Sequence, residues 1–488
     1  MWLPLLPDPP GDRNGGTGGD RIRSTPRPRG TLFLFVAMAL SCLAPTRARA
    51  VPAFARKYQT SCQTCHVIFP KLNPYGAAFR LNGYHLPAET EELVKQKPVS
   101  LGADAYARMW PEMVYPSTLP GNVPFAMNVN VASVYASSHD ETGRTITHND
   151  FQFPQEANLF AAGTLGNQFS FFSELTYEEE PDGGSAIELE HVRLDIVSPF
   201  GPEHLFNFRI GKLTSNLFDG FQGMWLMTNN GAETLFAYNP IGFNGGTSLA
   251  GDGGGGVSLP GTTRAVEMYG VAAHRLFYTV GVSSPVGPGG SSGQFNNNSS
   301  KDFYARVDYK FGGLGLDGDS AGAKVPPQNW RETSFRIGVF GYAGDGSDVD
   351  FEIADPAGNP FKMQQRRFNR LGVYGSLYLG DLNLIGVAVH GSDDLSLRDD
   401  ETDAEISRAT RTWDAWFAQA DYVIAPPFQV SVRYENLRPA DPSVDTLQVL
   451  NANFSFLARA NIKLMLEYRR DLHDARDYQL ATVIRADF

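Results

Sequence analysis

The chain has 488 residues, 19% of them charged, and 53 acidic against 41 basic side chains give it a net charge of −12. This acidic balance argues against a nucleic-acid partner, because binding to phosphates needs a basic surface. A mean hydropathy of −0.25 excludes a bundle of apolar transmembrane helices.

The first predicted element is a secretory signal peptide at residues 1–50. Four arginines between positions 21 and 29 precede the only long apolar run, 31–44, and the stretch TRARA ends in a small-x-small site. This order describes a signal peptide too short to span a bilayer, cleaved after Ala50. Its removal leaves 34 basic and 50 acidic side chains, a net charge of −16. Cys42 belongs to this leader, and the residues before it fit a lipoprotein signal poorly.

Residues 51–124 form the next predicted segment, with helical patterns at 73–83 and 88–97. Its stretch TSCQTCH, 60–66, holds both cysteines that remain in the mature chain. Three interpretations compete, namely a redox disulfide, part of a zinc site, and the attachment point of a c-type haem. A zinc site needs a fourth ligand and usually a second cysteine pair, which this chain lacks. A disulfide suits an oxidising compartment but does not require His66.

The haem interpretation accounts for all three residues of the C-x-x-C-H motif. Two thiols at this spacing match the two vinyl groups of haem, and the adjoining imidazole reaches the proximal face of the iron. We therefore predict one covalently attached haem c on Cys62 and Cys65, with His66 as the metal ligand. The candidates for the sixth iron ligand are His85, Met109 and Met113.

From Phe125 to the C-terminus the hydrophobic period changes to two, which is typical of β-strands. In FYARVDYKF, 303–311, apolar residues fall on one face and mainly charged residues on the other. The sequence predicts sixteen strands, which start near Phe125, Gln152, Gln168, Ile187, His204, Thr263, Arg275, Asp302, Thr333, Arg367, Leu382, Thr412, Phe428, Leu447, Ala460 and Tyr478.

The connections between these strands alternate in length. Tight turns follow the second, fourth, sixth, tenth, twelfth and fourteenth strands, and most other connections are long and rich in Gly, Asn, Ser and Asp. An even strand number with this asymmetry is typical of an outer-membrane barrel, whose closure pairs every backbone group. The connection 312–330 departs from the pattern, because it is long where a short turn is expected. The last strand ends in Phe488, which resembles the recognition signal of outer-membrane proteins.

Residues 52–87, PAFARKYQTSCQTCHVIFPKLNPYGAAFRLNGYHLP, resemble the N-terminal segment of the fused monohaem cytochrome c–porins, which include outer-membrane iron oxidases. That family joins a small haem segment carrying F-A-R, C-x-x-C-H, F-P-x-L-N and G-x-x-F to a sixteen-stranded barrel. The corresponding pieces here are 54–56, 62–66, 69–73 and 76–79. The resemblance covers the haem segment closely and the barrel only in architecture.

The expected fold is therefore all-β, a sixteen-stranded transmembrane outer-membrane barrel (125–488) with a small N-terminal α-helical cytochrome segment. A segment this small buries little surface by itself, so we expect it to enter the barrel lumen from the periplasmic side. A soluble periplasmic β-protein with a redox C-x-x-C is the weaker alternative.

Two functions remain open. In the first, the resemblance implies electron transfer between an extracellular donor such as Fe(II), or an acceptor, and periplasmic carriers, which makes an Fe(II)-oxidising activity one expectation. In the second, the chain is a diffusion porin whose haem is structural or sensory. The expected partners are outer-membrane lipid, periplasmic electron carriers and the extracellular donor or acceptor.

Other candidate chemistry in the sequence is weak. The glycine run 251–256 lacks the strand-to-helix context of a phosphate site. Carboxylates between Asp393 and Glu405, on a predicted outer loop, suit hard cations such as Fe(II), but a solvated acidic loop is the favoured interpretation. His139 and His148, in the first outer loop, carry the same ambiguity.

Overall fold

The computed structural model describes residues 53–58, 60–86, 99–100, 118–119, 124–139, 144–179, 185–200, 204–217, 259, 262–284, 300–319, 328, 330–344, 350–354, 360–399, 402, 404–440, 446–474 and 476–488. The signal peptide, the predicted helix at 88–97, the glycine run at 251–256, Met109 and Met113 lie outside these residues. Among the described residues, no helix is long and apolar enough to cross a membrane.

The barrel strands are β5 (Phe125–His139), β6 (Thr145–Leu165), β7 (Phe169–Glu179), β8 (Ser185–Ile196), β9 (Asn207–Thr214), β10 (Thr262–Ala272), β11 (Leu276–Ser283), β12 (Asp302–Gly312), β13 (Glu332–Gly344), β14 (Asp350–Ala354), β15 (Pro360–Gly380), β16 (Leu382–Asp399), β17 (Glu405–Ala425), β18 (Phe428–Arg438), β19 (Leu447–Arg459), β20 (Ile462–Asp471) and β21 (Tyr478–Asp487). The N-terminal part contributes α2 (Ala53–Tyr58), η1 (Cys62–Thr64), β1 (His66–Ile68), β2 (Lys71–Leu72) and α3 (Pro74–Leu81), and a separate small ladder joins β3 (Val99–Ser100) to β4 (Thr118–Leu119).

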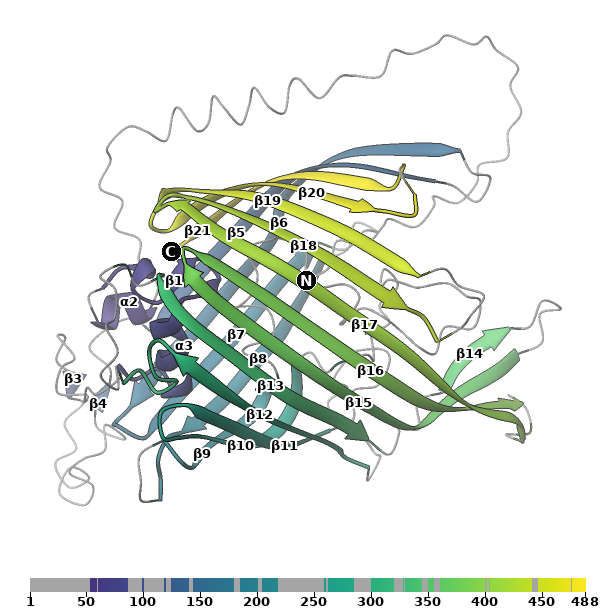
Figure 1. Ribbon diagram of the computed structural model, residues 1–488, viewed down its shortest axis with the longest axis horizontal. Coiled ribbons are helices and arrows are strands. Elements are labelled where there is room, and N and C mark those ends of the chain that lie inside the picture. The colour runs from purple at the N-terminus through teal and green to yellow at the C-terminus, as the bar shows by residue number, and fades with distance from the viewer. Residues whose placement is uncertain are drawn as a thin grey trace, which may run out of the picture.

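The strands form a closed antiparallel barrel (Figure 1). Sixteen of them make the wall, and β21 pairs with β5 to close it. The short β14 pairs with the outer end of β15, whose inner part pairs with β13, so it extends the wall without adding to the circle. The predicted strand number and fold class are therefore confirmed. Each predicted start falls within an observed strand or at most three residues before it.

The alternation along the strands separates lipid from lumen. In β12 the outward residues Phe303, Val307 and Phe311 are exposed, whereas the inward residues Arg306 and Asp308 are buried. A soluble sheet would expose the charged face instead. An apolar exterior on a barrel without sheet edges is what hydrocarbon requires.

The outer hairpins run further as strands than the sequence indicated. β16 continues to Asp399 and β17 begins at Glu405, so most of the predicted acidic loop is paired ladder. His148 likewise lies in β6, and His139 ends β5. A spanning strand needs only about 10 residues, and β6, β15 and β17 have 21 each. These hairpins keep their ladders beyond the bilayer because antiparallel pairing continues to satisfy the backbone groups of both strands.

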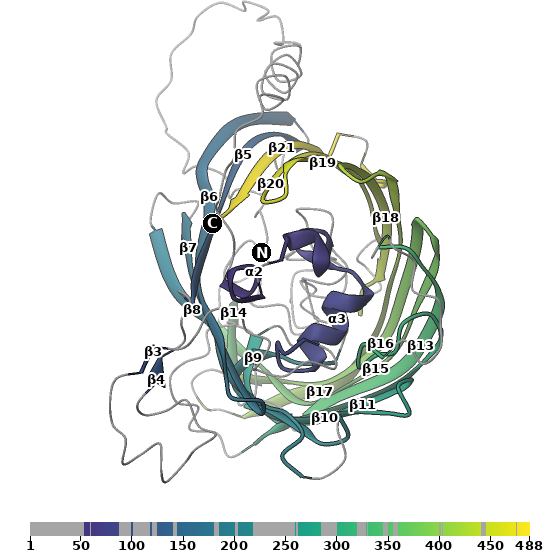
Figure 2. The ribbon, with the colours of Figure 1, turned by 90° about the vertical axis from the view of Figure 1, so that its left-hand side faces the viewer.

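The elements of the N-terminal part lie inside the barrel, as Figure 2 shows for α2 and α3. They contact the short-turn end of the wall, at Phe125 and Gly166 and at Ala460 between β19 and β20. Short turns face the periplasm in barrels of this class. Asp317 belongs to the connection 312–330, the one long connection predicted at this end. Its backbone carbonyl accepts a hydrogen bond from the Asn82 side-chain NH₂ at 3.0 Å. We call residues 53–86 the plug.

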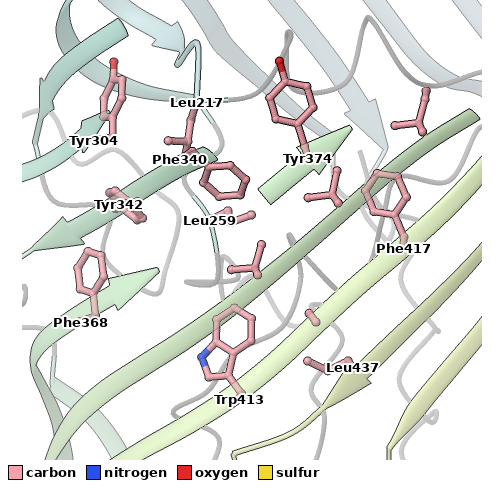
Figure 3. Packing of buried hydrophobic residues seen from close by; sticks show 14 of the residues in the cluster. Leu217, Leu259, Tyr304, Phe340, Tyr342, Phe368, Tyr374, Trp413, Phe417 and Leu437 are labelled. Atoms are coloured by element: carbon pink, nitrogen blue, oxygen red, sulfur yellow. The ribbon is translucent and has the colours of Figure 1, made fainter. Parts of the chain in front are cut away.

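A second part of the interior is apolar (Figure 3). Trp413 and Phe417 of β17 belong to one buried cluster with Phe340 of β13 and Tyr374 of β15. Trp413 is 0% exposed although it shares the lumen face of its strand with buried Gln419. At this level the lumen side of β17 is buried.

The strand direction yields a topology prediction. An epitope inserted near Asp399, on the long hairpin, is expected to bind antibody on intact cells. An epitope near Asn167, in the short turn between β6 and β7, is expected to bind only after the outer membrane is permeabilised. Equal labelling of both epitopes on intact cells would show that the strand direction is wrong.

Candidate cofactor-attachment site

The C-x-x-C-H motif forms one tight turn of the plug. Cys62 begins the 3₁₀ helix η1, Cys65 follows its last residue, and His66 begins β1. The Cys65 amide donates to the Cys62 carbonyl at 3.2 Å, which brings the two cysteines onto consecutive corners of the turn. Both thiols are free. The turn therefore presents two thiols and one imidazole within five residues.

Asn73 ties this turn to the helix that follows it. Its side-chain oxygen accepts from the Gly76 amide at 2.8 Å and caps α3, the arrangement that Asn favours at a helix start. Its side-chain NH₂ donates to the carbonyls of Gln63 and Thr64 at 3.2 and 3.0 Å. Because Asn73 is only 1% exposed, it satisfies both groups without water. One side chain thus holds the middle of the C-x-x-C turn against α3.

Gly76 is the closest neighbour of that turn on α3. A Cβ at this position would lie 2.0 Å from the Cys65 carbonyl oxygen and 2.9 Å from the Cys65 Cα. Both contacts are to backbone, so no rotamer change relieves them. Helix and turn meet at a distance that only glycine allows.

The His66 ring is held in one orientation. Its Nδ1 lies 3.1 Å from the Pro70 carbonyl oxygen, so the proton belongs on Nδ1 and the lone pair is left on Nε2. The ring packs against Phe69, with centroids 4.7 Å apart. Burial lowers the pKa of His66 to about 4, with smaller contributions from the cations Arg485 and Lys463. The imidazole is therefore neutral at pH 7, the form that ligates a metal.

The two thiols are not poised for disulfide exchange. Burial raises the pKa of Cys62 to about 11 and that of Cys65 to about 12. Redox C-x-x-C motifs instead stabilise the thiolate, because the thiolate is the nucleophile. Two partly buried neutral thiols beside a neutral imidazole fit thioether attachment of a haem c, with the imidazole as the iron ligand among the three.

The plug is fastened to the wall around its circumference. Lys71, 1% exposed, donates to Asn383 Oδ1 at 2.7 Å and pairs with Asp421, which lies on the next strand. On other parts of the wall, Lys463 donates to the Phe69 carbonyl at 2.7 Å, Gln429 to the Val67 carbonyl at 3.0 Å, and Tyr269 to the Leu81 carbonyl at 2.8 Å.

The His85 ring bonds to the backbone of the plug and of the barrel wall and does not face the C-x-x-C-H motif. Its Nδ1 lies 3.1 Å from the Asn82 carbonyl oxygen, and its Nε2 lies 2.9 Å from the Gly166 carbonyl oxygen. With both ring nitrogens facing carbonyls, His85 joins the plug to the β6–β7 turn and does not offer a lone pair to iron in this arrangement.

Among the described acidic residues of the predicted outer loop, the neighbours Asp393 and Asp394 have different partners. Asp393 is 0% exposed and accepts from Arg370 at 2.6 Å and from the Trp413 indole at 2.9 Å. Its neighbour Asp394 pairs with Arg408. Both carboxylates belong to the paired β16 ladder, and Asp393 is a buried residue of the wall, not part of a solvated loop.

Sequence reasoning missed most of the polar residues that hold the site. Asn73 stands inside the resemblance motif, and an Asn before Pro-x-Gly is a helix-start signal that could have indicated its role. Lys71, Gln429 and Lys463 carry no local signal, because their partners are hundreds of residues away in the chain.

No family model matches the chain, and no curated protein matches it in sequence. Solved structures with a similar fold include OmpT of Vibrio cholerae, at 10% identity and a TM-score of 0.45, and OmpF of Salmonella typhi in complex with daunomycin, at 12% and 0.47. An anion-selective porin from Comamonas acidovorans matches at 11% and 0.44. Each match covers 75% of this chain and 98% of the other.

The closed wall, the apolar exterior and the alternation of long and short connections define a class of protein. The chain is a porin-type β-barrel of the bacterial outer membrane, in contact with its lipid. Within that class it carries its own N-terminal residues as a plug at the short-turn mouth.

Proposed function

We propose that this protein is an outer-membrane c-type cytochrome–porin that carries electrons between an extracellular donor, such as Fe(II), and periplasmic carriers. Haem c attached to Cys62 and Cys65, with His66 as proximal ligand, would supply a one-electron carrier in the plug. An external acceptor would use the same residues with electrons flowing outward. The proposal agrees with the resemblance of the plug to the fused monohaem cytochrome c–porins.

The observation that carries this proposal is the orientation of His66 in the motif. The Pro70 carbonyl accepts a hydrogen bond from the Nδ1–H of His66, which leaves Nε2 as the ligand atom. Asn73 and Gly76 fix the turn that carries the two thiols. These residues hold the two thiols and the imidazole in place, so little further ordering is needed to attach a haem and to supply its axial ligand.

The place of the plug supports electron exchange with the periplasm. The motif sits at the short-turn mouth, and Cys62 and Cys65 are neither fully buried nor widely exposed. A carrier in the periplasm can approach this end of the barrel, while the long hairpins extend from the other end. A haem held at this turn would be within reach of periplasmic carriers, which supports the proposal.

A diffusion porin is the second candidate function, and the barrel architecture favours it. Lumen-facing side chains of an open porin border water. Here the lumen-facing Trp413 and Val449 are both 0% exposed, and the plug is bonded to the wall. These features support electron transfer over solute flux.

His66→Ala tests the proposal. The variant is expected to fold as a barrel, because stability lies in the strand ladder and the lipid-facing residues. Its haem is expected to lose the proximal ligand, so that the absorption spectrum changes and reduction by Fe(II) in detergent is lost. The measurement is a spectroscopic titration with Fe(II), with heat-dependent electrophoretic migration as the check on folding.

His473→Ala is the matched control, since His473 is exposed at the β20–β21 hairpin. It is expected to titrate like the wild type. If wild-type haem stays oxidised with every donor while the protein conducts small solutes in planar bilayers, electron transfer fails and the diffusion porin takes its place.

A further inference from the structure

The barrel wall carries a second set of ligating side chains, apart from the C-x-x-C-H turn. Glu174 of β7 and Glu190 and His191 of β8 each bring one ligand atom to a common place, and these atoms all lie within 4.8 Å of one another. Glu174 and His191 are direct partners across the two strands. Two carboxylates and one imidazole are a ligand set that divalent transition metals accept.

Strand register turns this set toward the lumen. Phe172, two residues before Glu174, stacks on Tyr84 of the plug with ring centroids 6.1 Å apart. Residues two apart on a strand share a face, so Glu174 also faces inward, one step further from the short turns. The register shifts beside Glu174 and leaves Glu190 as the extra residue of a bulge. A bulge re-aims side chains, and here it brings Glu190 to the same place as its neighbour His191.

Further polar side chains orient the members of the set. The Thr176 hydroxyl donates to Glu190 Oε2 at 2.9 Å. His191 Nε2 lies 2.7 Å from Thr214 Oγ1. Partners of this kind are usual behind metal ligands, because they hold the ring in one orientation. With Nε2 at Thr214, the other ring nitrogen, Nδ1, faces the carboxylates.

Nδ1 of His191 is buried and lies 2.8 Å from Glu174 Oε2, an ion-pair distance without hydrogen-bond geometry. A cation bound by all three side chains would engage Nδ1 and both carboxylates at once. Metal bonds of about 2.0–2.2 Å place ligand atoms at most about 4.4 Å apart, so a small side-chain movement closes the site.

We propose that Glu174, Glu190 and His191 bind a divalent first-row transition-metal cation on the lumen wall, on the external side of the plug. The set lies one step further from the short turns than Phe172, which contacts the plug. From the set an unbroken series of ring contacts leads into the plug, from His191 to Phe172 at 5.8 Å, on to Tyr84 at 6.1 Å and then to Phe54 at 4.6 Å.

The same site would hold the donor, and this assignment rests on the proposed function. Fe(II) bound there would lose one electron and become Fe(III), and a ferric haem held by Cys62, Cys65 and His66 would gain that electron. Carboxylate oxygens bind Fe(II) and bind Fe(III) more strongly, so these ligands would favour loss of the electron. Cation binding itself does not depend on haem.

The test of the site is a titration of the full-length mature protein in detergent with Mn(II), with free Mn(II) measured by its EPR signal. His191→Asn and Glu174→Gln are expected to raise the Kd at least about tenfold, as loss of a ligand should exceed the 10- to 100-fold effect of losing an outer partner. Glu188→Gln is the matched control, since Glu188 lies on the same strand, is 63% exposed and pairs with Lys212. Electrophoretic migration confirms that each barrel is folded.

His66→Ala separates this proposal from the proposed function, because it removes the haem ligand and is expected to leave Mn(II) binding unchanged. A His191→Asn titration that superimposes on the wild type would overturn the site. If Mn(II) binding is lost in His191→Asn while the rate of haem reduction at low Fe(II) stays at the wild-type value, the cation site stands and its role as donor site is wrong. If wild-type haem is not reduced by Fe(II), the proposed function fails and the Mn(II) result still decides the site.

Discussion

Haem peroxidase staining is expected to survive denaturing electrophoresis of the mature protein, and Cys65→Ala is expected to weaken or abolish it. Thioether bonds persist when the fold is lost, whereas iron coordination alone does not hold haem through denaturation. The variant keeps only Cys62 and therefore at most one covalent bond. The stain, normalised to the amount of protein in the band, gives the measurement.

Ser61→Ala is the control for this experiment. Ser61 directly precedes the motif, is exposed and makes no side-chain cap to η1, so its substitution should leave the stain at the wild-type level. Loss of stain from the unmutated protein after denaturation would defeat covalent attachment, and the redox-disulfide interpretation of Cys62 and Cys65 would then return.

Gly76→Ala is expected to loosen the plug without unfolding the barrel. Alanine in place of glycine usually stabilises a helix by about 1 kcal/mol. Here the added Cβ meets the Cys65 carbonyl oxygen at 2.0 Å, and overpacking of this kind costs about 1–3 kcal/mol or more. The backbone N–H of Asn73 donates a hydrogen bond to that oxygen at 2.9 Å. The turn therefore cannot move away from the helix without losing this hydrogen bond.

The measurement is the rate at which a protease cleaves residues 60–76 in detergent, followed by mass spectrometry, together with the haem spectrum. Ala77→Gly is the matched control, since it costs about 1 kcal/mol of helix propensity on the same helix and adds no atom. Cleavage should be faster in Gly76→Ala than in Ala77→Gly. Equal protection of Gly76→Ala and the wild type would show that helix and turn are not in the contact described.

The barrel was predictable because its signals are local. Alternation within each strand, tight turns between some of them and an even strand count all depend on neighbours in the chain, so all sixteen strands were found, although three predicted starts fall seven residues inside the observed strands. The lengths of the outer hairpins were not predictable. Gly, Ser and Asp between 391 and 404 are typical of loops, yet pairing with the facing strand keeps β16 extended to Asp399.

The attachment motif was visible in the sequence because Cys62, Cys65 and His66 act at a fixed short spacing. Their chemistry as a haem site stays a prediction. The support of the motif was only partly visible, since an Asn before Pro-x-Gly indicates a helix start but not that Asn73 also donates to Gln63 and Thr64. His85 seemed available as an iron ligand, and only the folded turn at Gly166 shows that its ring bonds to the wall.

By itself the sequence determined the period-two strands, their number and a compact C-x-x-C-H turn, because each follows from residues within a few positions of one another. The sequence predicted that the plug enters the lumen from the periplasmic side, but only the tertiary structure decided how it is held there, with Lys71 reaching Asp421 across 350 positions of the chain. It also decided that Glu174 meets Glu190 and His191, since the pairing register and the bulge of β7 and β8 bring them together. The physical reason is that closure of the barrel brings strands distant in sequence around one lumen. The alternation of side chains along a strand predicts which residues face the lumen, but not which of them contact one another.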